Sequence, residues 1–339
     1  MRDEEIVSQA VRQALGDVEV EAPQVLAGGA MHQSWGAVAV ENGEKRKVVI
    51  RISPAGRDDR EKTRQEYSVL RVMHARGVMV PKPLFVGENE LGQTFMAMDR
   101  LAGDSNPKQL LTAPQFEETR HVMAKQLAEQ LAQIHQATPE EVEEAHLRGA
   151  RGDEDAIIHE WDRLDEQYKD VAFNAFPAVV WGMRYVRREQ AKLAPRRRPV
   201  HVVHGDFRVG NLMYDESGLT GILDWEGVHI GEPEDDLTWF LTRVWRFGNN
   251  SKEAGGLVTR EEWVQLYETA SGNKIDRDRL RLWEVLQNVR WANICMMQAK
   301  SHMDGSIPSH ELAAIGRRTA DTELEVLRLA APRGATNAG

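Results

Sequence analysis

Three oxygen-bearing side chains in one short stretch are of the types that phosphoryl-transfer chemistry uses: Asp206, Asn211 and Asp224. Magnesium binds oxygen ligands and takes only one or two of them from protein, which suits an amide and a carboxylate. A further carboxylate can accept or orient the proton of an attacking hydroxyl. Asn211 and Asp224 are therefore the predicted metal ligands, and Asp206 is the predicted proton acceptor.

A short hairpin must position two of these groups. The apolar runs 212–214 and 219–223 have the pattern of strands, and the turn Asp215–Gly218 between them ends in a glycine that is free to adopt positive φ. This hairpin predicts that Asn211 and Asp224 come to the same open end.

The register of the hairpin follows from the turn. If Tyr214 pairs with Leu219, then Asn211 lies opposite Ile222, and Asp206 lies just upstream on the loop that feeds the same end. Any one of these polar residues alone would be ordinary in a turn or cap. Their spacing taken together favours a site.

The motifs around these residues resemble the two signatures of the aminoglycoside-phosphotransferase and choline-kinase superfamily. The segments that carry the resemblance are His204-Gly205-Asp206 with Asn211, Ile222-Leu223-Asp224-Trp225, and the continuation Gly231–Leu237. The resemblance implies an α+β, bilobal, protein-kinase-like fold, with a small antiparallel-sheet N-lobe and a larger, mainly helical C-lobe. It also implies ATP as the phosphoryl donor and Mg²⁺ as the cofactor.

The same resemblance implies roles for individual residues. Asp206 would be the catalytic base, and Asn211 and Asp224 would bind magnesium. Asp236 would brace the catalytic loop from a following helix, and His204 would hold the loop by hydrogen bonding.

A nucleotide site should then lie in the first hundred residues. The segment Leu26–Trp35 is expected to cover the phosphates with its backbone N–H groups and with Ser34, although it lacks the glycine patterns of protein kinases and P-loops. Arg51 is expected to hold the α- and β-phosphates through its forked guanidinium. Glu66 is the expected partner that orients Arg51, with Glu61 as the competitor.

The hinge of the family also has a counterpart here. The segment Phe95–Gly103 resembles it, and adenine is expected to pair with the Asp99 carbonyl and the Leu101 N–H. Both groups belong to the backbone, so the side chains give no information about these bonds.

The organisation of the chain agrees with two lobes. Residues 1–100 are expected to form the nucleotide-binding lobe, with a hairpin at Asn42-Gly43, and residues 101–331 the helical lobe with the acceptor site. Residues 332–339 are expected to be a disordered tail. The expected strands are 18–27, 35–40, 47–53, 84–87 and 94–98, and the expected helices are 57–76, 115–136, 156–168, 177–193, 260–270, 280–303 and 312–329.

The composition excludes several classes of function. The 339 residues carry a formal net charge of −10, so the chain has no basic footprint for a nucleic acid. The single cysteine, Cys295, fits a reducing compartment. The charged N-terminus has no signal-peptide core, and no run of about 18 apolar residues occurs. We therefore expect a cytoplasmic protein that does not bind membranes, as a monomer or homodimer.

The sequence gives less information about the chemical class of the phosphoryl acceptor. Asp224 is followed within a few residues by Gly231-Glu232-Pro233, which leaves little room for a peptide-docking segment and disfavours a protein substrate. The subpattern 205–211, together with Asp224-Trp225-Glu226 and His229, resembles the kinase-like domains fused to acyl-CoA dehydrogenases, which implies a hydroxylated acyl metabolite. Aminoglycosides, choline-like alcohols and sugars are alternatives, and the net charge slightly favours cationic acceptors. A non-catalytic nucleotide-binding module is a further alternative. Residues 156–168 and 283–303 are expected to supply the acceptor side.

Overall fold

The structure is a computed structural model, and it describes residues 3–26, 33–56, 58–193 and 198–331. The chain forms two compact units. Unit 1 comprises residues 1–147 and 210–228, and unit 2 comprises residues 148–209 and 229–339. The predicted lobe boundary after residue 100 stays a prediction, and the predicted tail 332–339 lies outside the described residues.

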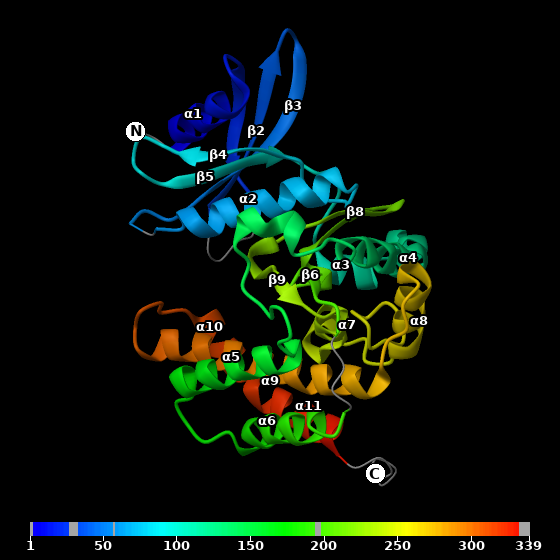
Figure 1. Cartoon of the computed structure of the whole chain (residues 1–339). Helices are drawn as coiled ribbons and strands as arrows, with labels where there is room; N and C mark the ends of the chain where they lie inside the picture. Colours follow the sequence, from blue (N-terminus) through cyan, green and yellow to red (C-terminus); the bar gives the residue numbers. More distant parts are fainter. Residues whose placement is uncertain (1–2, 27–32, 57, 194–197, 332–339) are drawn as a thin grey trace. The chain divides into compact units, whose positions relative to one another are not determined.

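Unit 1 is built on one five-stranded antiparallel sheet with the strand order β1-β2-β3-β5-β4 (Figure 1). The hairpin between β2 and β3 turns at Asn42 and Gly43, whose φ angles of 52° and 84° confirm the predicted tight turn. The strands are β1 (Glu19–Val25), β2 (Gln33–Glu41), β3 (Glu44–Ile52), β4 (Pro83–Glu88) and β5 (Thr94–Asp99).

Side chains alternate between the two faces of this sheet. Helix α1 (Asp3–Leu15) covers one face, where its apolar stripe packs with Trp35, Ile50 and Phe95. Arg51 follows Ile50 and therefore belongs to the opposite face. Helix α1 was not predicted, although buried Ile6, Val7, Ala10 and Val11 have helical spacing.

The hairpin of residues 212–222 also belongs to unit 1. Helix α4 packs against its second strand, where Gln126 Oε1 accepts a hydrogen bond of 2.9 Å from the Leu219 N–H. The Ile222 N–H donates to the Met79 carbonyl at 2.7 Å. The other elements of unit 1 are α2 (Arg60–Ala75), α3 (Pro107–Thr112), η1 (Pro114–Phe116), α4 (Glu117–Ile134), η2 (Glu140–Ala145), β7 (Leu212–Asp215), β8 (Gly218–Ile222) and η4 (Trp225–Gly227).

Unit 2 is mainly helical and centres on the long helix α9 (Arg277–Met303). Helices α5, α6 and α11 pack around α9 and share one apolar core with it. The strands β6 and β9 form a small antiparallel pair. The other elements are α5 (Ala156–Val171), α6 (Pro177–Gln190), β6 (His201–Val203), β9 (His229–Gly231), α7 (Pro233–Leu241), η5 (Arg243–Arg246), α8 (Arg260–Ser271), α10 (His310–Gly316) and α11 (Thr319–Ala330). The short helix η3 (Val209–Asn211) includes the point in the sequence at which unit 2 ends and unit 1 resumes.

One helix prediction was wrong. The segment 312–329 was expected to be a single helix, but the chain turns after α10 and restarts as α11. Gly316 ends α10 against α9, where a Cβ atom at Gly316 would lie 2.5 Å from Ala299 Cβ. Glycine is a weak helix former, and this close approach leaves no room for another residue type, so the break occurs there.

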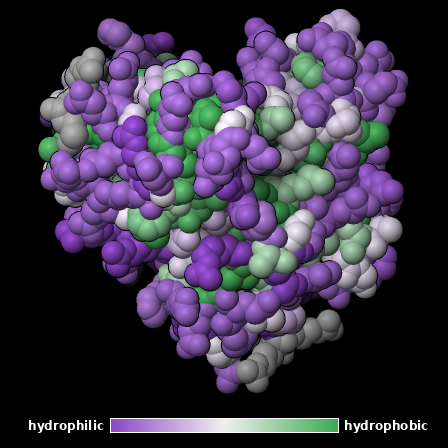
Figure 2. All heavy atoms as spheres, turned by 90° about the horizontal axis from the view of Figure 1, so that it is seen from above, coloured by the Kyte–Doolittle hydropathy of each residue, from purple (hydrophilic) through white to green (hydrophobic). Residues whose placement is uncertain are grey.

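The face of the molecule drawn in Figure 2 is mostly hydrophilic, with smaller apolar areas between charged and polar side chains. This agrees with a mean hydropathy of −0.51. Over the part of the chain that the structure describes, no helix is long and apolar enough to cross a membrane.

Candidate active site

Arg51 and Glu66 form the centre of the candidate nucleotide site in unit 1. The Arg51 guanidinium binds both carboxylate oxygens of Glu66, at 2.7 and 2.9 Å. The Arg51 side chain is 17% exposed and that of Glu66 only 4%. The structure thus places Glu66, and not its competitor Glu61, against Arg51. A buried bidentate pair fixes the guanidinium in one plane, which is the arrangement needed to present it to phosphate oxygens.

Glu226 is a third member of this cluster that the sequence analysis missed. Its Oε1 accepts a hydrogen bond of 2.8 Å from Arg51 Nη2. Burial opposes the charge of Arg51, but the carboxylates of Glu66 and Glu226 outweigh it and raise the pKa of Arg51. The signal was present in the motif Asp224-Trp225-Glu226, but nothing in the sequence says that Glu226 reaches back to β3.

The substitution Glu226→Gln tests whether this contact competes with nucleotide. Phosphate oxygens would have to share Arg51 Nη2 with a carboxylate, and removal of that negative charge also reduces repulsion of the nucleotide. We expect the Kd for ADP, measured by isothermal titration calorimetry, to fall roughly three- to tenfold, a gain of about 1 kcal/mol. Glu61→Gln on the exposed side of α2 is the control. An unchanged or higher Kd for the Glu226 variant would mean that Glu226 positions Arg51 and does not compete.

Asn211 and Asp224 lie beside each other at the open end of the β7–β8 hairpin, as predicted, but the predicted register was wrong. Tyr214 does pair with Leu219, whereas Ile222 pairs with Leu212 and not with Asn211. A bulge in β8 adds one residue and shifts the pairing. The Asn211 carbonyl instead accepts a hydrogen bond of 2.8 Å from the Leu223 N–H, directly before Asp224.

Asp224 has an unusual backbone conformation. Its φ of 66° and ψ of 67° lie in the left-handed region, which costs energy for most residues but is tolerated best by glycine, asparagine and aspartate. Strained residues of this kind gather at functional sites. The left-handed turn directs the chain into η4, which carries Glu226 to Arg51.

The residues around Asp224 fit a divalent cation. Burial raises the pKa of Glu66, and the negative charges of Glu226 and Asp224 act in the same direction. Three carboxylates thus surround one guanidinium, an excess of negative charge that a cation would relieve. Within the described ranges, no group of three His, Cys, Asp or Glu residues is arranged to hold a metal. The pair Asn211 and Asp224 offers two oxygen donors, which is the number that magnesium takes when phosphate and water supply the rest.

The other predicted nucleotide contacts also belong to unit 1. Ser34 pairs with Arg51 across β2 and β3, while residues 27–32 of the predicted phosphate cradle lie outside the described residues. The Asp99 carboxylate binds Arg46 at 2.6 and 2.9 Å. Leu101 packs on β8, where a Cβ atom at Gly221 would lie 2.1 Å from Leu101 Cδ1. The adenine contacts of Asp99 and Leu101 stay predictions.

The catalytic-loop motif belongs to unit 2 and is held by Asp236. One oxygen of the Asp236 carboxylate accepts from the His204 N–H at 2.7 Å, and the other accepts from the Gly205 N–H at 2.8 Å. The Asp206 N–H in turn donates to His204 Nδ1 at 3.1 Å. Asp236 and His204 are both fully buried. The loop backbone is therefore fixed from beneath by an aspartate on α7 and from within by its own histidine.

Two further side chains contact Asp206 and were not predicted, and a third packs on one of them. Trp239 Nε1 donates to Asp206 Oδ1 at 2.7 Å, and Arg208 Nε lies 3.2 and 3.1 Å from the two carboxylate oxygens. The Arg208 guanidinium stacks 4.8 Å above the Trp245 ring. Trp239 follows Asp236 by three residues on α7, so both point toward the loop. That spacing was the available signal for Trp239.

The substitution Trp239→Phe tests whether the indole positions Asp206. It removes the hydrogen bond to a carboxylate, worth about 1.5–3 kcal/mol, and we expect kcat to fall roughly 10- to 100-fold with little change in the KM for nucleotide. Trp283→Phe is a matched control, because Trp283 is also buried and also donates to a carboxylate, Glu232, at 2.8 Å. An equal loss of kcat in both variants would mean that Trp239 supports only the core.

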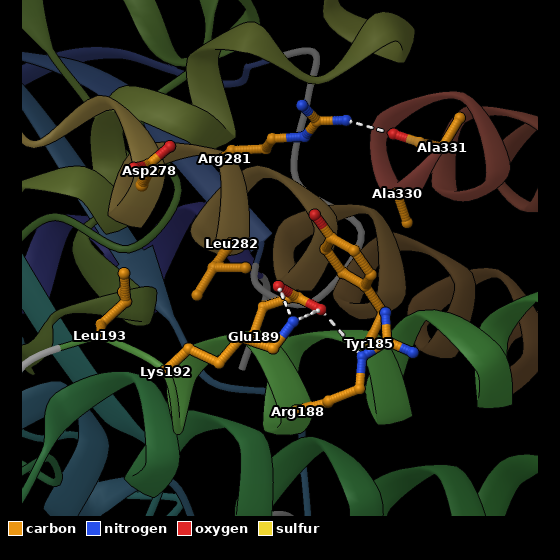
Figure 3. Close-up of a pocket in the computed structure, with 10 residues that line it drawn as sticks. All are labelled: Tyr185, Arg188, Glu189, Lys192, Leu193, Asp278, Arg281, Leu282, Ala330 and Ala331. Carbon is orange, nitrogen blue, oxygen red and sulfur yellow. Dashed lines mark hydrogen bonds and ion pairs between the residues drawn. The ribbon is translucent and has the colours of Figure 1, made fainter. Parts of the chain in front are cut away.

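A separate cavity in unit 2 contains none of the predicted site residues. It lies between α6, α9 and the end of α11 (Figure 3). The cationic side chains that line the cavity are already paired with groups in the lining or next to it. Arg188 and Lys192 both pair with Glu189, and Arg281 donates to the Leu329 and Ala331 carbonyls. The catalytic loop and the β7–β8 hairpin therefore stay the predicted places of the chemistry.

Comparison with known proteins places these motifs in a family. The model of the phosphotransferase enzyme family matches residues 32–283, which include every predicted site residue from Ser34 to Asp236. The chain belongs to the phosphotransferase enzyme family. The resemblance stated from the motifs and the enzyme class that it implied are thereby confirmed.

Solved structures of related phosphotransferases share the fold. A protein from Ralstonia eutropha, provisionally described as an aminoglycoside phosphotransferase, aligns with a TM-score of 0.75 at 21% identity over 97% of this chain and 98% of its own. A choline/ethanolamine kinase family protein from Mesorhizobium loti aligns with a TM-score of 0.65 at 16% identity over 98% and 95%. The predicted α+β, protein-kinase-like fold of this phosphotransferase is confirmed.

Curated relatives match only part of their own length. Acyl-CoA dehydrogenase family member 11 from Pongo abelii is 24% identical over 278 residues, which cover 77% of this chain and 35% of that protein. Viomycin phosphotransferase from Streptomyces vinaceus is 28% identical over 171 residues, which cover 48% of this chain and 55% of that protein. The phosphotransferase therefore spans about half or less of the length of these relatives.

Proposed function

We propose that the chain is an ATP- and magnesium-dependent kinase that phosphorylates a hydroxyl group of a small molecule. The observation that carries the proposal is that each unit holds one prepared group of side chains, and that both groups belong to the motif set of one family. Arg51, oriented by Glu66, lies near Asp224 in unit 1, and Asp206 is held by Asp236 and Trp239 in unit 2. The convergence of Asp206 with Asn211 and Asp224 on one phosphate is part of the proposal.

The residues would divide the work as follows. Arg51 binds the α- and β-phosphates, and Asn211 and Asp224 hold magnesium, which when bound would offset the phosphate charge. Asp206 accepts the proton of the acceptor hydroxyl as its oxygen bonds to the γ-phosphorus and the bond to the β-phosphate oxygen breaks. The products are the phosphate monoester and ADP. The protein contributes mainly by positioning and by electrostatic stabilisation.

A small acceptor is favoured over a peptide by the segment after Asp224. Only η4 and β9 separate Asp224 from the start of α7 at Pro233, so no activation segment intervenes. Among small acceptors, a hydroxylated acyl metabolite is our first choice, supported by the match to acyl-CoA dehydrogenase family members. An aminoglycoside or choline-like alcohol is the second, supported by the match to viomycin phosphotransferase.

A screen for acceptor-dependent ADP release tests the proposal. Purified protein would be given magnesium with ATP or GTP and a panel of hydroxy acids, acyl alcohols, aminoglycosides, choline-like alcohols and sugars. We expect one class to raise ADP release above the hydrolysis baseline, with a phosphate monoester identified by mass spectrometry. Nucleotide binding without turnover on any acceptor would point to a non-catalytic module, and transfer to peptides alone would point to a protein kinase.

A further inference from the structure

A cluster of arginines in unit 2 connects to the catalytic loop and has no part in the proposed chemistry. The arginine cluster consists of Arg148, Arg163 and Arg290. Arg163 belongs to α5 and Arg290 to α9, two helices that pack side by side (Figure 1). Arg148 is tied to β9, because its carbonyl accepts a hydrogen bond of 2.8 Å from the Ile230 N–H. Three separate elements thus direct guanidinium groups to one region.

One buried carboxylate serves two members of the cluster. Glu160, which is 3% exposed, is bound at both oxygens by Arg163, with a distance of 2.7 Å from Nε to Oε2. Arg148 Nη1 reaches the same Oε2 at 3.3 Å. Burial opposes ionisation of Glu160, but Arg163 and then Arg148 outweigh it and lower its pKa. Glu160 is therefore ionised, and Arg163 compensates most of the negative charge of Glu160.

Arg290 links the cluster to the catalytic loop. Its Nη2 donates to the Gly205 carbonyl, one residue before Asp206, and its guanidinium lies 4.4 Å from the Trp239 ring centre. Its Nη1 is buried, lies 3.9 Å from Asp235 Oδ1 and makes no hydrogen bond to any described residue.

Asp235 compensates Arg290 only weakly, because the same carboxylate also binds His229 Nε2 at 3.0 Å and Gln287 Nε2 at 2.7 Å.

The cluster keeps positive charge that its own carboxylates do not balance. Three guanidinium groups face two carboxylates, Glu160 and Asp235. Arg148 is poorly compensated, because its Nη1 lies 3.3 Å from a carboxylate oxygen that Arg163 already binds. Burial, together with repulsion by Arg163 and Arg290, lowers the pKa of Arg148. Its side chain is nevertheless 40% exposed, so a ligand can reach it. This local excess of positive charge contrasts with the net charge of −10 of the whole chain.

We infer that the acceptor carries an anionic group, a carboxylate or a phosphate, which Arg148 binds while its hydroxyl meets Asp206. The inference rests on the proposed kinase function and narrows its substrate class. Arginine is the side chain best suited to recognise carboxylate and phosphate, through paired N–H donors. Arg208 adds a further guanidinium next to Asp206. Cationic acceptors such as aminoglycosides would be repelled here, so the local charge overrides the weak preference expected from the net charge.

Arg148→Gln is the sharpest test, because it leaves the Arg163–Glu160 pair in place. Four acceptors with one carbon chain and one hydroxyl would be compared: the carboxylate, its methyl ester, the amine and the phosphate ester. We expect the unaltered protein to prefer one of the anions over the methyl ester by about 100-fold in kcat/KM. That ratio should fall about tenfold in Arg148→Gln and recover in Arg148→Lys. Arg328→Gln, another partly exposed, ion-paired arginine in unit 2, is the control.

The outcomes separate the inference from the function on which it rests. Turnover without preference for either anion, or with preference for the amine, overturns the inference and leaves the kinase function intact. If no acceptor is turned over, the proposed function fails, and calorimetric binding of the carboxylate and the phosphate ester decides the inference. Binding that Arg148→Gln weakens supports an anion site, and absence of binding overturns it. Unchanged thermal unfolding of Arg148→Gln ensures that the variant is folded.

Discussion

Replacement of Asp206 with asparagine is expected to lower kcat by about 10³-fold, because a positioned general base contributes roughly 10²- to 10⁴-fold. Asparagine keeps an oxygen for the Trp239 indole N–H, so the loop should retain its shape while losing the group that accepts a proton. Steady-state ADP release with a saturating acceptor measures the loss. The Kd for magnesium nucleotide should change little, because its predicted ligands belong to unit 1.

The matched control for this substitution is Asp162→Asn on the exposed side of α5. It removes one carboxylate from unit 2 far along the chain from the loop, and kcat should stay within about twofold of the unaltered protein. Full turnover by Asp206→Asn would remove Asp206 from the role of base. A parallel loss of nucleotide affinity would instead indicate that the substitution disturbs both units.

Replacement of Asp224 with asparagine is expected to lower kcat/KM by about 10²-fold or more and to raise the magnesium concentration needed for half-maximal activity. A bound cation contributes several kcal/mol to phosphoryl transfer, and loss of a charged ligand weakens its binding. Asparagine tolerates the left-handed conformation of residue 224 as well as aspartate does, so the backbone should not change. A magnesium titration of activity and of nucleotide binding measures both effects.

Asp224→Ala separates chemistry from backbone strain. Alanine loses the same ligand but is also disfavoured at a φ of 66°, so it should unfold at a lower temperature than the asparagine variant. Both variants should show a similar loss of activity if the carboxylate is a metal ligand. Magnesium dependence identical to that of the unaltered protein in Asp224→Asn would remove Asp224 from the metal site.

The motifs predicted the family and, through the family, the fold, because a family signature consists of residues at short, fixed spacings. The turn at Asn42-Gly43 needs two residues in the left-handed region, and the β7–β8 hairpin follows from one glycine and two short strands. The bulge in β8 could not be predicted, because nothing in a run of ordinary strand residues indicates which one is left unpaired. Helix α1 was missed because its apolar stripe is short and lies among charged and polar residues.

The contacts that complete the group of side chains in each unit could not be predicted because they join distant parts of the chain. Glu226 lies 175 residues from Arg51, and Arg290 lies 85 residues from Gly205. Such pairs depend on how whole helices pack, which local patterns do not specify. The sequence held more information about Trp239, because its position three residues after Asp236 already placed both side chains on one face of α7.

The way Asp206 is held has a consequence for the products of the reaction. A carboxylate bound on one oxygen by an indole and on both by a guanidinium has little freedom to rotate toward hydroxyls presented from different directions. Proton transfer depends steeply on the distance and angle between the two oxygens. On a polyol, such an enzyme would phosphorylate a single hydroxyl and give one regioisomer. If the carboxylate were held less rigidly, the product would be a mixture of regioisomers.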